Sequence, residues 1–183
     1  MSDSKANFLD TFPAWLRTLG DDAEKLSALI GDASLPAGSR QVIAGGLNYL
    51  FKSLDLIPDG IDDIGYLDDA FVLRVAADLA VHEGTGDASG DALREFTRLA
   101  NDADAVREFL GKDYSRLETY VAGLRRGAAR GRSVDDVVSN DQIRGDFLSD
   151  VRGFCKAYSC PSFAREEKTL IKLRAFFDAK LPR

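Results

Sequence analysis

The segment from Ala70 to Val81 is apolar nearly all round, and only Arg74 and Asp78 interrupt it. A helix that is apolar on every side is stable in water only when other parts of the chain surround it. We therefore predict a buried central helix here, within a longer helix from about Tyr66 to Glu83. An arginine inside such a helix must be paired, because an unpaired buried charge is prohibitively costly.

The rest of the chain supplies helices to surround this one, and it contains no convincing strand. Residues 8–19 and 21–30 have helical apolar spacing, with Pro13 expected in the first turn of the former. Another helix is expected over about 39–54, and residues 143–158 carry a strong amphipathic stripe. The sequence thus predicts an all-α fold, a helical bundle of about eight to ten helices with no significant β-sheet.

A glycine-rich stretch, Gly84–Gly90, is the clearest candidate linker. Residues 1–88 carry 6 basic and 15 acidic side chains, whereas residues 89–183 carry 18 basic and 15 acidic ones. We predict an acidic helical region over 1–88 and a helical bundle region over 89–183. The two regions either stand apart or pack together as one domain.

The overall composition excludes several classes of protein. A net charge of −6 over 183 residues is not that of a basic nucleic-acid binder. Two cysteines do not make a disulfide framework, and they favour a reducing compartment. The first ten residues lack the apolar stretch of a signal peptide, and no apolar run is long enough to cross a membrane. We therefore expect a protein of the cytoplasm, either free or in peripheral contact with a membrane.

Six aspartates fall between residues 55 and 69, and no lysine or arginine lies between Lys52 and Arg74. The six are Asp55, Asp59, Asp62, Asp63, Asp68 and Asp69. Aspartates crowded this closely repel one another unless water, a cation or a base offsets their charge. Arg74, bidentate to Asp78 or to one of these aspartates, is the preferred base, and Arg40 and Lys52 are the alternatives.

Local structure accounts for part of the aspartate run. Pro58 pushes the preceding residue out of helical conformation, and Gly65 is expected to take the left-handed conformation that closes the turn. Asp59 is expected to cap that turn. Asp68 and Asp69 are expected in the first turn of the next helix, where a negative charge is favoured by about 0.3–1 kcal/mol.

Residues 40–83 resemble the YkvA-like family, a bacterial domain of unknown function. The resemblance rests on Asp55-Leu56-Ile57-Pro58-Asp59 followed by Gly65-Tyr66-Leu67-Asp68-Asp69. It implies a small helical module with no established activity, so it assigns no catalytic residue. It marks six positions for testing: Asp55, Pro58, Asp59, Gly65, Asp68 and Asp69.

The favoured function is a non-enzymatic protein-interaction or scaffold module, in which the acidic surface recruits a basic protein partner. No catalytic constellation is recognisable, and no cofactor is expected in this interpretation. The alternative is a divalent-metal-binding protein or metal-dependent enzyme. Carboxylates without His or Cys suit Mg²⁺, Ca²⁺ or Mn²⁺. The candidate ligands are Asp55, Asp59, Asp68 and Asp69.

A second alternative rests on the one basic cluster of the chain, Arg125, Arg126, Arg130 and Arg132. Clustered arginines attract anionic lipid headgroups, so this segment is a candidate for peripheral binding to an anionic membrane.

Overall fold

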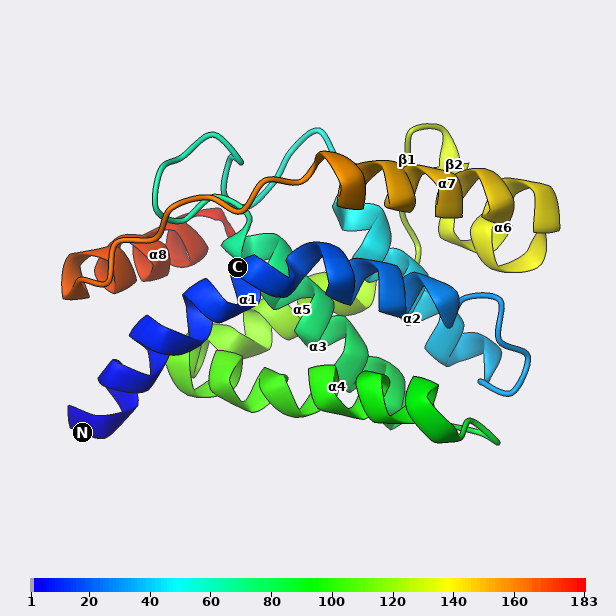
Figure 1. The fold of residues 1–183 in the computed structure, drawn as a ribbon, viewed down its shortest axis with the longest axis horizontal. Coiled ribbons are helices and arrows are strands. Elements are labelled where there is room, and N and C mark those ends of the chain that lie inside the picture. The colour runs from blue at the N-terminus through cyan, green and yellow to red at the C-terminus, as the bar shows by residue number, and fades with distance from the viewer. Residues whose placement is uncertain (1) are drawn as a thin grey trace.

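The fold is all-α, as the sequence predicts. The structure, a computed structural model, describes residues 2–183, with side chains described from Phe8 onward. Within that part eight α-helices occur, at the low end of the predicted number, together with one 3-10 helix at Gly111–Asp113 (Figure 1). The α-helices are α1 (Ser2–Ala28), α2 (Ala37–Tyr49), α3 (Leu67–Glu83), α4 (Gly90–Leu110), α5 (Tyr114–Leu124), α6 (Val134–Ser139), α7 (Asp141–Ala157) and α8 (Glu167–Lys180). Two short strands, β1 (Ala128–Ala129) and β2 (Arg132–Ser133), pair antiparallel between α5 and α6.

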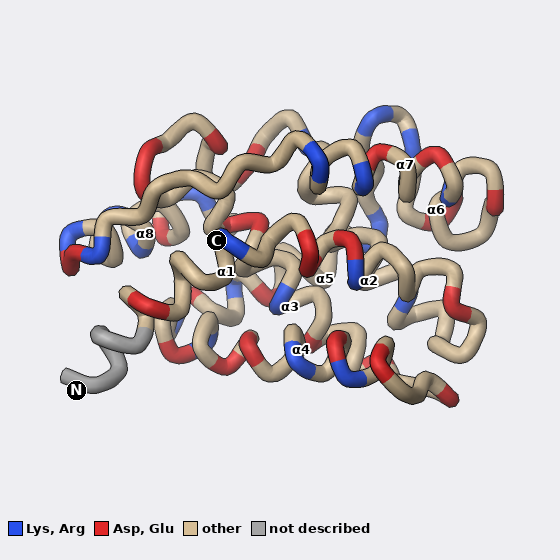
Figure 2. The backbone as a smooth tube through the Cα atoms, viewed as in Figure 1, with Lys and Arg blue, Asp and Glu red and all other residues tan. Residues whose placement is uncertain are grey.

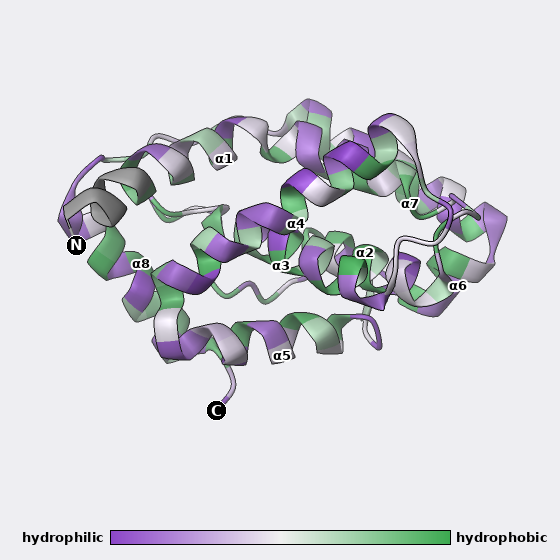
Figure 3. Ribbon diagram, turned by 90° about the horizontal axis from the view of Figure 1, so that it is seen from below, coloured by the Kyte–Doolittle hydropathy of each residue, from purple (hydrophilic) through white to green (hydrophobic). Residues whose placement is uncertain are grey.

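Helix α3 is the central element, which confirms the expectation from its apolar sequence. Every residue from Leu67 to Ala77 is buried. Helices α2 and α4 pack along α3, and α1 and α5 also contact it (Figure 3). The approach of α2 is close because it carries glycine where the helices meet: a Cβ at Gly46 would lie 2.6 Å from the Cβ of Ala76.

Arg74 on α3 is fully buried, and its ion pairs differ from those expected. Its Nη2 donates to Asp22 Oδ2 on α1 at 3.0 Å, and its Nε donates to Asp102 Oδ2 on α4 at 3.1 Å. Nη1 donates to the carbonyl of Ala70 at 3.1 Å, and the guanidinium carbon lies 4.1 Å from the ring centroid of Trp15. Each nitrogen of the guanidinium therefore donates to a group outside the aspartate run.

The expected pairing of Arg74 with Asp78 or with a motif carboxylate is thus wrong. Asp69 lies five residues before Arg74, which at 100° per residue places the two side chains about 140° apart around the helix. Asp78 is one turn further along α3 and pairs with Arg107 and His82 instead.

Two helix boundaries also differ from the expectation. Helix α1 runs without a break through both segments predicted as separate helices, and Pro13 lies inside it rather than in its first turn. Pro13 is buried, so packing of the α1 apolar face offsets the backbone hydrogen bond that proline cannot make. Helix α2 ends at Tyr49, five residues before the expected end, because the chain tightens into i→i−3 bonds at residues 50–52.

The two halves of the chain contribute to one hydrophobic core. The ring of Phe71 on α3 lies 5.0 Å from Phe12 on α1, 5.9 Å from Phe109 on α4 and 5.2 Å from Phe177 on α8. Four helices distant in sequence meet at this aromatic cluster. The division of the chain at Gly84–Gly90 stays a prediction. No helix in the described part of the chain combines the length and hydropathy of a membrane span.

We expect Asp22→Asn to lower the free energy of unfolding by about 3–5 kcal/mol, because it leaves the buried Arg74 guanidinium short of a counter-charge. The Asp91→Asn variant is the matched control, because it removes an exposed pair with Arg94 and costs about 1 kcal/mol or less. Urea unfolding of both variants measures the difference. Equal losses in the two variants would contradict a structural role for the Arg74 network.

Candidate functional site: the acidic turn between α2 and α3

The turn between α2 and α3 is held by two buried side chains, Tyr49 and Asp68. The Tyr49 hydroxyl accepts the N–H of Leu56 at 2.7 Å and donates to Asp68 Oδ2 at 2.5 Å. The same carboxylate oxygen accepts the N–H of Ile57 at 3.0 Å. Tyr49 and Asp68 thereby satisfy one backbone donor each, those of Leu56 and Ile57, in the segment that Pro58 keeps out of helical structure. We call residues 55–69 the acidic turn.

The backbone of the acidic turn differs from the expectation at Gly65. The left-handed residues are Asp63, with φ of 77°, and Tyr66, with φ of 66°, whereas Gly65 has no positive φ. Glycine is required at position 65 for a different reason: a Cβ there would lie 2.3 Å from the carbonyl oxygen of Asp59. The turn folds tightly back on itself at this point.

Asp68 and Asp69 form the inner carboxylates of the acidic turn, and both lie in the first turn of α3 as expected. Asp68 is fully buried and Asp69 is 3% exposed. Asp68 Oδ1 and Asp69 Oδ2 have no hydrogen-bond partner. Burial raises the pKa of Asp68 to about 6, and burial together with the charge of Asp68 holds the pKa of Asp69 well above its usual range.

Asp55 and Asp59 form the outer carboxylates. Asp59 is exposed and Asp55 is half-buried. Burial, and then the charge of Asp59, raise the pKa of Asp55 to about 6. Burial raises the pKa of Asp59, and the Tyr66 hydroxyl opposes that rise. No backbone N–H of the described residues donates to the Asp59 carboxylate, so it does not act as the expected backbone cap. The mutual influence of the four pKa values places the inner and outer carboxylates in one electrostatic cluster.

Tyrosines surround this cluster. Tyr49 packs edge-on against Tyr120 of α5 at 6.2 Å, and Tyr66 packs edge-on against Tyr158, just after α7, at 5.2 Å. Burial raises the pKa of Tyr158 and of Tyr120, and the charges of Asp69 and Asp55, respectively, add to the rise. The carboxylates are therefore enclosed by weak acids rather than by bases.

The carboxylates of the acidic turn have no basic partner in the described part of the chain. None of its six aspartates forms an ion pair with a described lysine or arginine. Lys52 lowers the pKa of Asp55 slightly and lies 5.6 Å from the Tyr120 ring, and Lys172 of α8 donates to the backbone carbonyl of Asp62. The expected alternatives Arg40 and Lys52 therefore do not pair with the aspartates either.

Of the predicted site residues, the structure brings together Asp55, Asp59, Asp68 and Asp69, with Pro58 and Gly65 shaping the turn. It places Arg74 and Asp78 elsewhere on α3. The sequence reasoning missed Tyr49, Tyr66 and Tyr158. Tyr66 adjoins the motif, but no local pattern indicates that Tyr49 and Tyr158 face it, because this depends on how α2 and α7 pack.

Carboxylates without basic partners attract a proton or an external cation. Among the described residues, no group of three or more His, Cys, Asp or Glu side chains encloses a position for a metal ion. The acidic turn is therefore not a ready-made cage of protein ligands.

The basic cluster is largely occupied within the chain. Arg125 pairs with Glu83 at 3.0 Å, and Arg130 and Arg132 share the carboxylate of Asp150. Arg126 is exposed and forms no ion pair with a described side chain. Binding of this segment to an anionic membrane stays a prediction.

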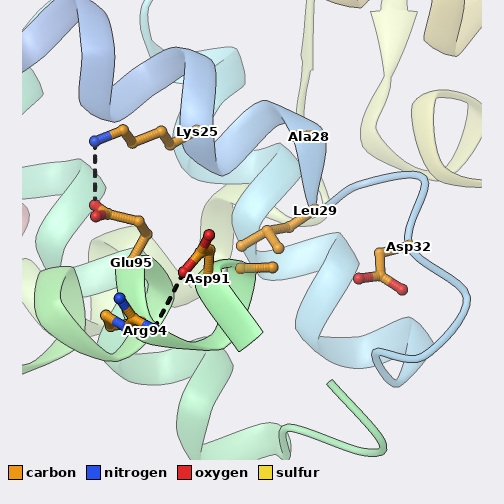
Figure 4. A pocket seen from close by; sticks show the side chains of 8 residues that line it. Lys25, Ala28, Leu29, Asp32, Asp91, Arg94 and Glu95 are labelled. Atoms are coloured by element: carbon orange, nitrogen blue, oxygen red, sulfur yellow. Dashed lines mark ion pairs between the residues drawn. The ribbon is translucent and has the colours of Figure 1, made fainter. Parts of the chain in front are cut away.

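A separate hollow of about 430 Å³ lies between the end of α1 and the start of α4 (Figure 4). Ala28, Leu29 and Ala92 line it, and its rim carries two ion pairs, Lys25 with Glu95 and Arg94 with Asp91. No Ser, Cys or His lines it. The two ion pairs use four of its charged groups, and the fifth, Asp32, accepts hydrogen bonds from Ser34.

Comparison with known proteins gives one finding. A family model described as "Protein of unknown function (DUF1232)" matches residues 40–74, about a fifth of the chain. The matched segment includes most of α2, the acidic turn and α3 as far as Arg74. No curated protein and no solved structure matches the chain. The segment is thus similar to a domain of unknown function, and the YkvA-like resemblance stays a prediction.

We expect Tyr49→Phe to lower the free energy of unfolding by about 1–3 kcal/mol, because the buried N–H of Leu56 loses its acceptor and Asp68 loses a donor. Tyr120→Phe is the matched control, because no hydrogen bond from its hydroxyl is found. Chemical denaturation of the two variants makes the comparison. A Tyr49→Phe variant as stable as Tyr120→Phe would show that the hydroxyl bridge does not hold the turn.

We also expect the protein to become more stable as the pH falls from about 7.5 to 5.5. The pKa values of Asp55 and Asp68 rise on folding from 3.8 to about 6, so the native state binds more protons in this range. Their stabilising contribution is complete below the unfolded pKa and is lost as the pH rises through about 6. The urea midpoint measured with chelator at several pH values reports this trend.

The Asp55→Asn variant is expected to flatten this pH dependence. Asp62→Asn, a change of the same charge on an exposed side chain of the same turn, is expected to preserve it. A wild-type midpoint that falls steadily from pH 7.5 to 5.5 would contradict the raised pKa values.

Proposed function

We propose that the protein is a non-enzymatic interaction module whose acidic turn binds a basic segment of a protein partner. The observation that carries the proposal is that six aspartates are concentrated in one turn and none forms an ion pair with a described lysine or arginine. Figure 2 shows this acidic connection between α2 and α3 beside the lysines and arginines of α8. Those basic side chains form no ion pair with the carboxylates of the turn, of which Asp59 and Asp62 are exposed to solvent.

The outer side chains of the acidic turn are accessible to solvent, as binding of a partner requires. Asp59 and Asp62 are exposed, and Asp55 and Asp63 are partly so. Carboxylates at a surface attract a positively charged partner, speed its association at low salt and favour it over neutral competitors.

An exposed apolar side chain adjoins these carboxylates. Leu54 is 84% exposed, which is unusual for a leucine, and it immediately precedes Asp55. Together with Phe51 and Lys52 it lines a shallow hollow of about 250 Å³. An apolar anchor beside charged groups is the usual composition of a binding patch. The partner that fits is a segment with arginine or lysine residues around an apolar side chain.

The proposal is tested with a labelled peptide of arginine and leucine residues, whose binding is followed by fluorescence anisotropy with chelator present. We expect the Asp55→Asn/Asp59→Asn double variant to bind about 3- to 10-fold more weakly, as for the loss of two surface charge interactions. Leu54→Ala is expected to weaken binding as well, without changing its salt dependence.

The matched control is Glu24→Gln/Glu108→Gln, which removes two exposed charges from α1 and α4 and leaves the net charge equal to that of the double variant. Its affinity is expected to remain within about twofold of the wild type, since distant exposed charges are screened by salt. If both double variants lose affinity equally, the peptide senses only net charge, and the proposed site is wrong.

A further inference from the structure

We infer that the acidic turn also binds one partly hydrated divalent cation of the Mg²⁺, Ca²⁺ or Mn²⁺ class, through Asp59 and Asp69. This site concerns the inner side of the turn, and it does not depend on the proposed binding of a basic partner. Its basis is the pair of buried carboxylate oxygens that the fold leaves without any partner.

The first step is the burial of an uncompensated charge. Asp69 Oδ2 and Asp68 Oδ1 are enclosed by the protein, and neither oxygen has a hydrogen-bond partner among the described residues. Buried polar groups in native proteins are nearly always satisfied, so such atoms indicate a missing partner. Two neighbouring residues with the same deficiency indicate a partner of positive charge.

The second step is the position of the other carboxylates. Burial is the main cause of the raised pKa values of Asp55, Asp68 and Asp69, and the charge of Asp59 adds to all three. Asp59 is exposed and Asp69 is buried, so the proposed ion would have one ligand at the surface and one inside the protein. The Tyr66 hydroxyl opposes the rise in the pKa of Asp59.

The third step is the chemistry of the donors. The cluster offers only carboxylate and phenol oxygens, which select hard divalent cations over zinc or copper. Since no three acidic side chains of the described chain enclose one position, the ion must keep several waters. Mg²⁺ is commonly held in this way, by one or two carboxylates with water completing its shell. Asp55 and Asp68 would then act through coordinated water.

The experiment uses the full chain after removal of metal with a chelator. Mn²⁺ is titrated in, and free Mn²⁺ is followed by electron paramagnetic resonance. We expect one Mn²⁺ to bind per chain. Thermal unfolding is then recorded with Mg²⁺, Ca²⁺ and Mn²⁺ in turn, at constant ionic strength. At a metal concentration about one hundred times the dissociation constant, Tm should rise by about 5–10 °C for a chain of this size.

Asp69→Asn is expected to abolish both the Mn²⁺ binding and the Tm shift, and Asp59→Asn to weaken them. Asp62→Asn removes the same charge from an exposed position of the same turn and is expected to keep both. The inference is overturned if the free Mn²⁺ signal is undiminished at millimolar metal. It is also overturned if Asp69→Asn binds as the wild type does, because the ion then sits on the outer surface only. Because peptide binding is measured with chelator, failure here leaves the proposed function separately testable.

Discussion

The structure depends on one constraint: the central helix α3 carries buried charges of both signs, and its buried base, Arg74, is paired with acids of other helices. Arg74 is neutralised by Asp22 from α1 and Asp102 from α4, and these contacts join three helices around a buried guanidinium. Asp68 and Asp69, at the other end of the same helix, receive no such partner. The helix dipole favours them by at most about 2 kcal/mol. Burying an ionised carboxylate costs several kcal/mol even after relaxation, so the dipole alone does not offset it.

The lack of a basic partner for Asp68 and Asp69 among the described residues connects the fold to the proposed function. The Tyr49–Asp68 bridge and the close approach at Gly65 keep the carboxylates together in a tight turn rather than letting them separate in solvent. A chain selected only for stability would replace a buried, unpartnered aspartate with an apolar or amide residue. Local conflict with stability is typical of sites kept for binding. In the proposed function the exposed carboxylates and Leu54 bind a protein partner, and in the further inference Asp59 and Asp69 bind a cation.

Much of the fold could be predicted from the sequence because its signals are local. The apolar run of α3 indicated a buried central helix, and the helical spacing elsewhere indicated a bundle. The ion pairs of Arg74 could not be predicted, since Asp22 and Asp102 lie 52 and 28 residues away along the chain and meet it only through packing. The acidic turn was evident as a motif, whereas the role of Tyr49 depends on α2 ending five residues early. The expected left-handed Gly65 was wrong because Asp63 and Tyr66 adopt that conformation instead.

The most direct test of this account is the free energy of unfolding of Asp69→Asn, measured at neutral pH with chelator present. Asparagine nearly preserves the shape of the side chain and removes a charge that no described lysine or arginine pairs with. The account predicts a variant at least as stable as the wild type, more stable by about 1 kcal/mol or more if the carboxylate is ionised there, since one pKa unit corresponds to 1.36 kcal/mol. A loss of about 1 kcal/mol or more would contradict it, because Asp69 would then be compensated within the native fold.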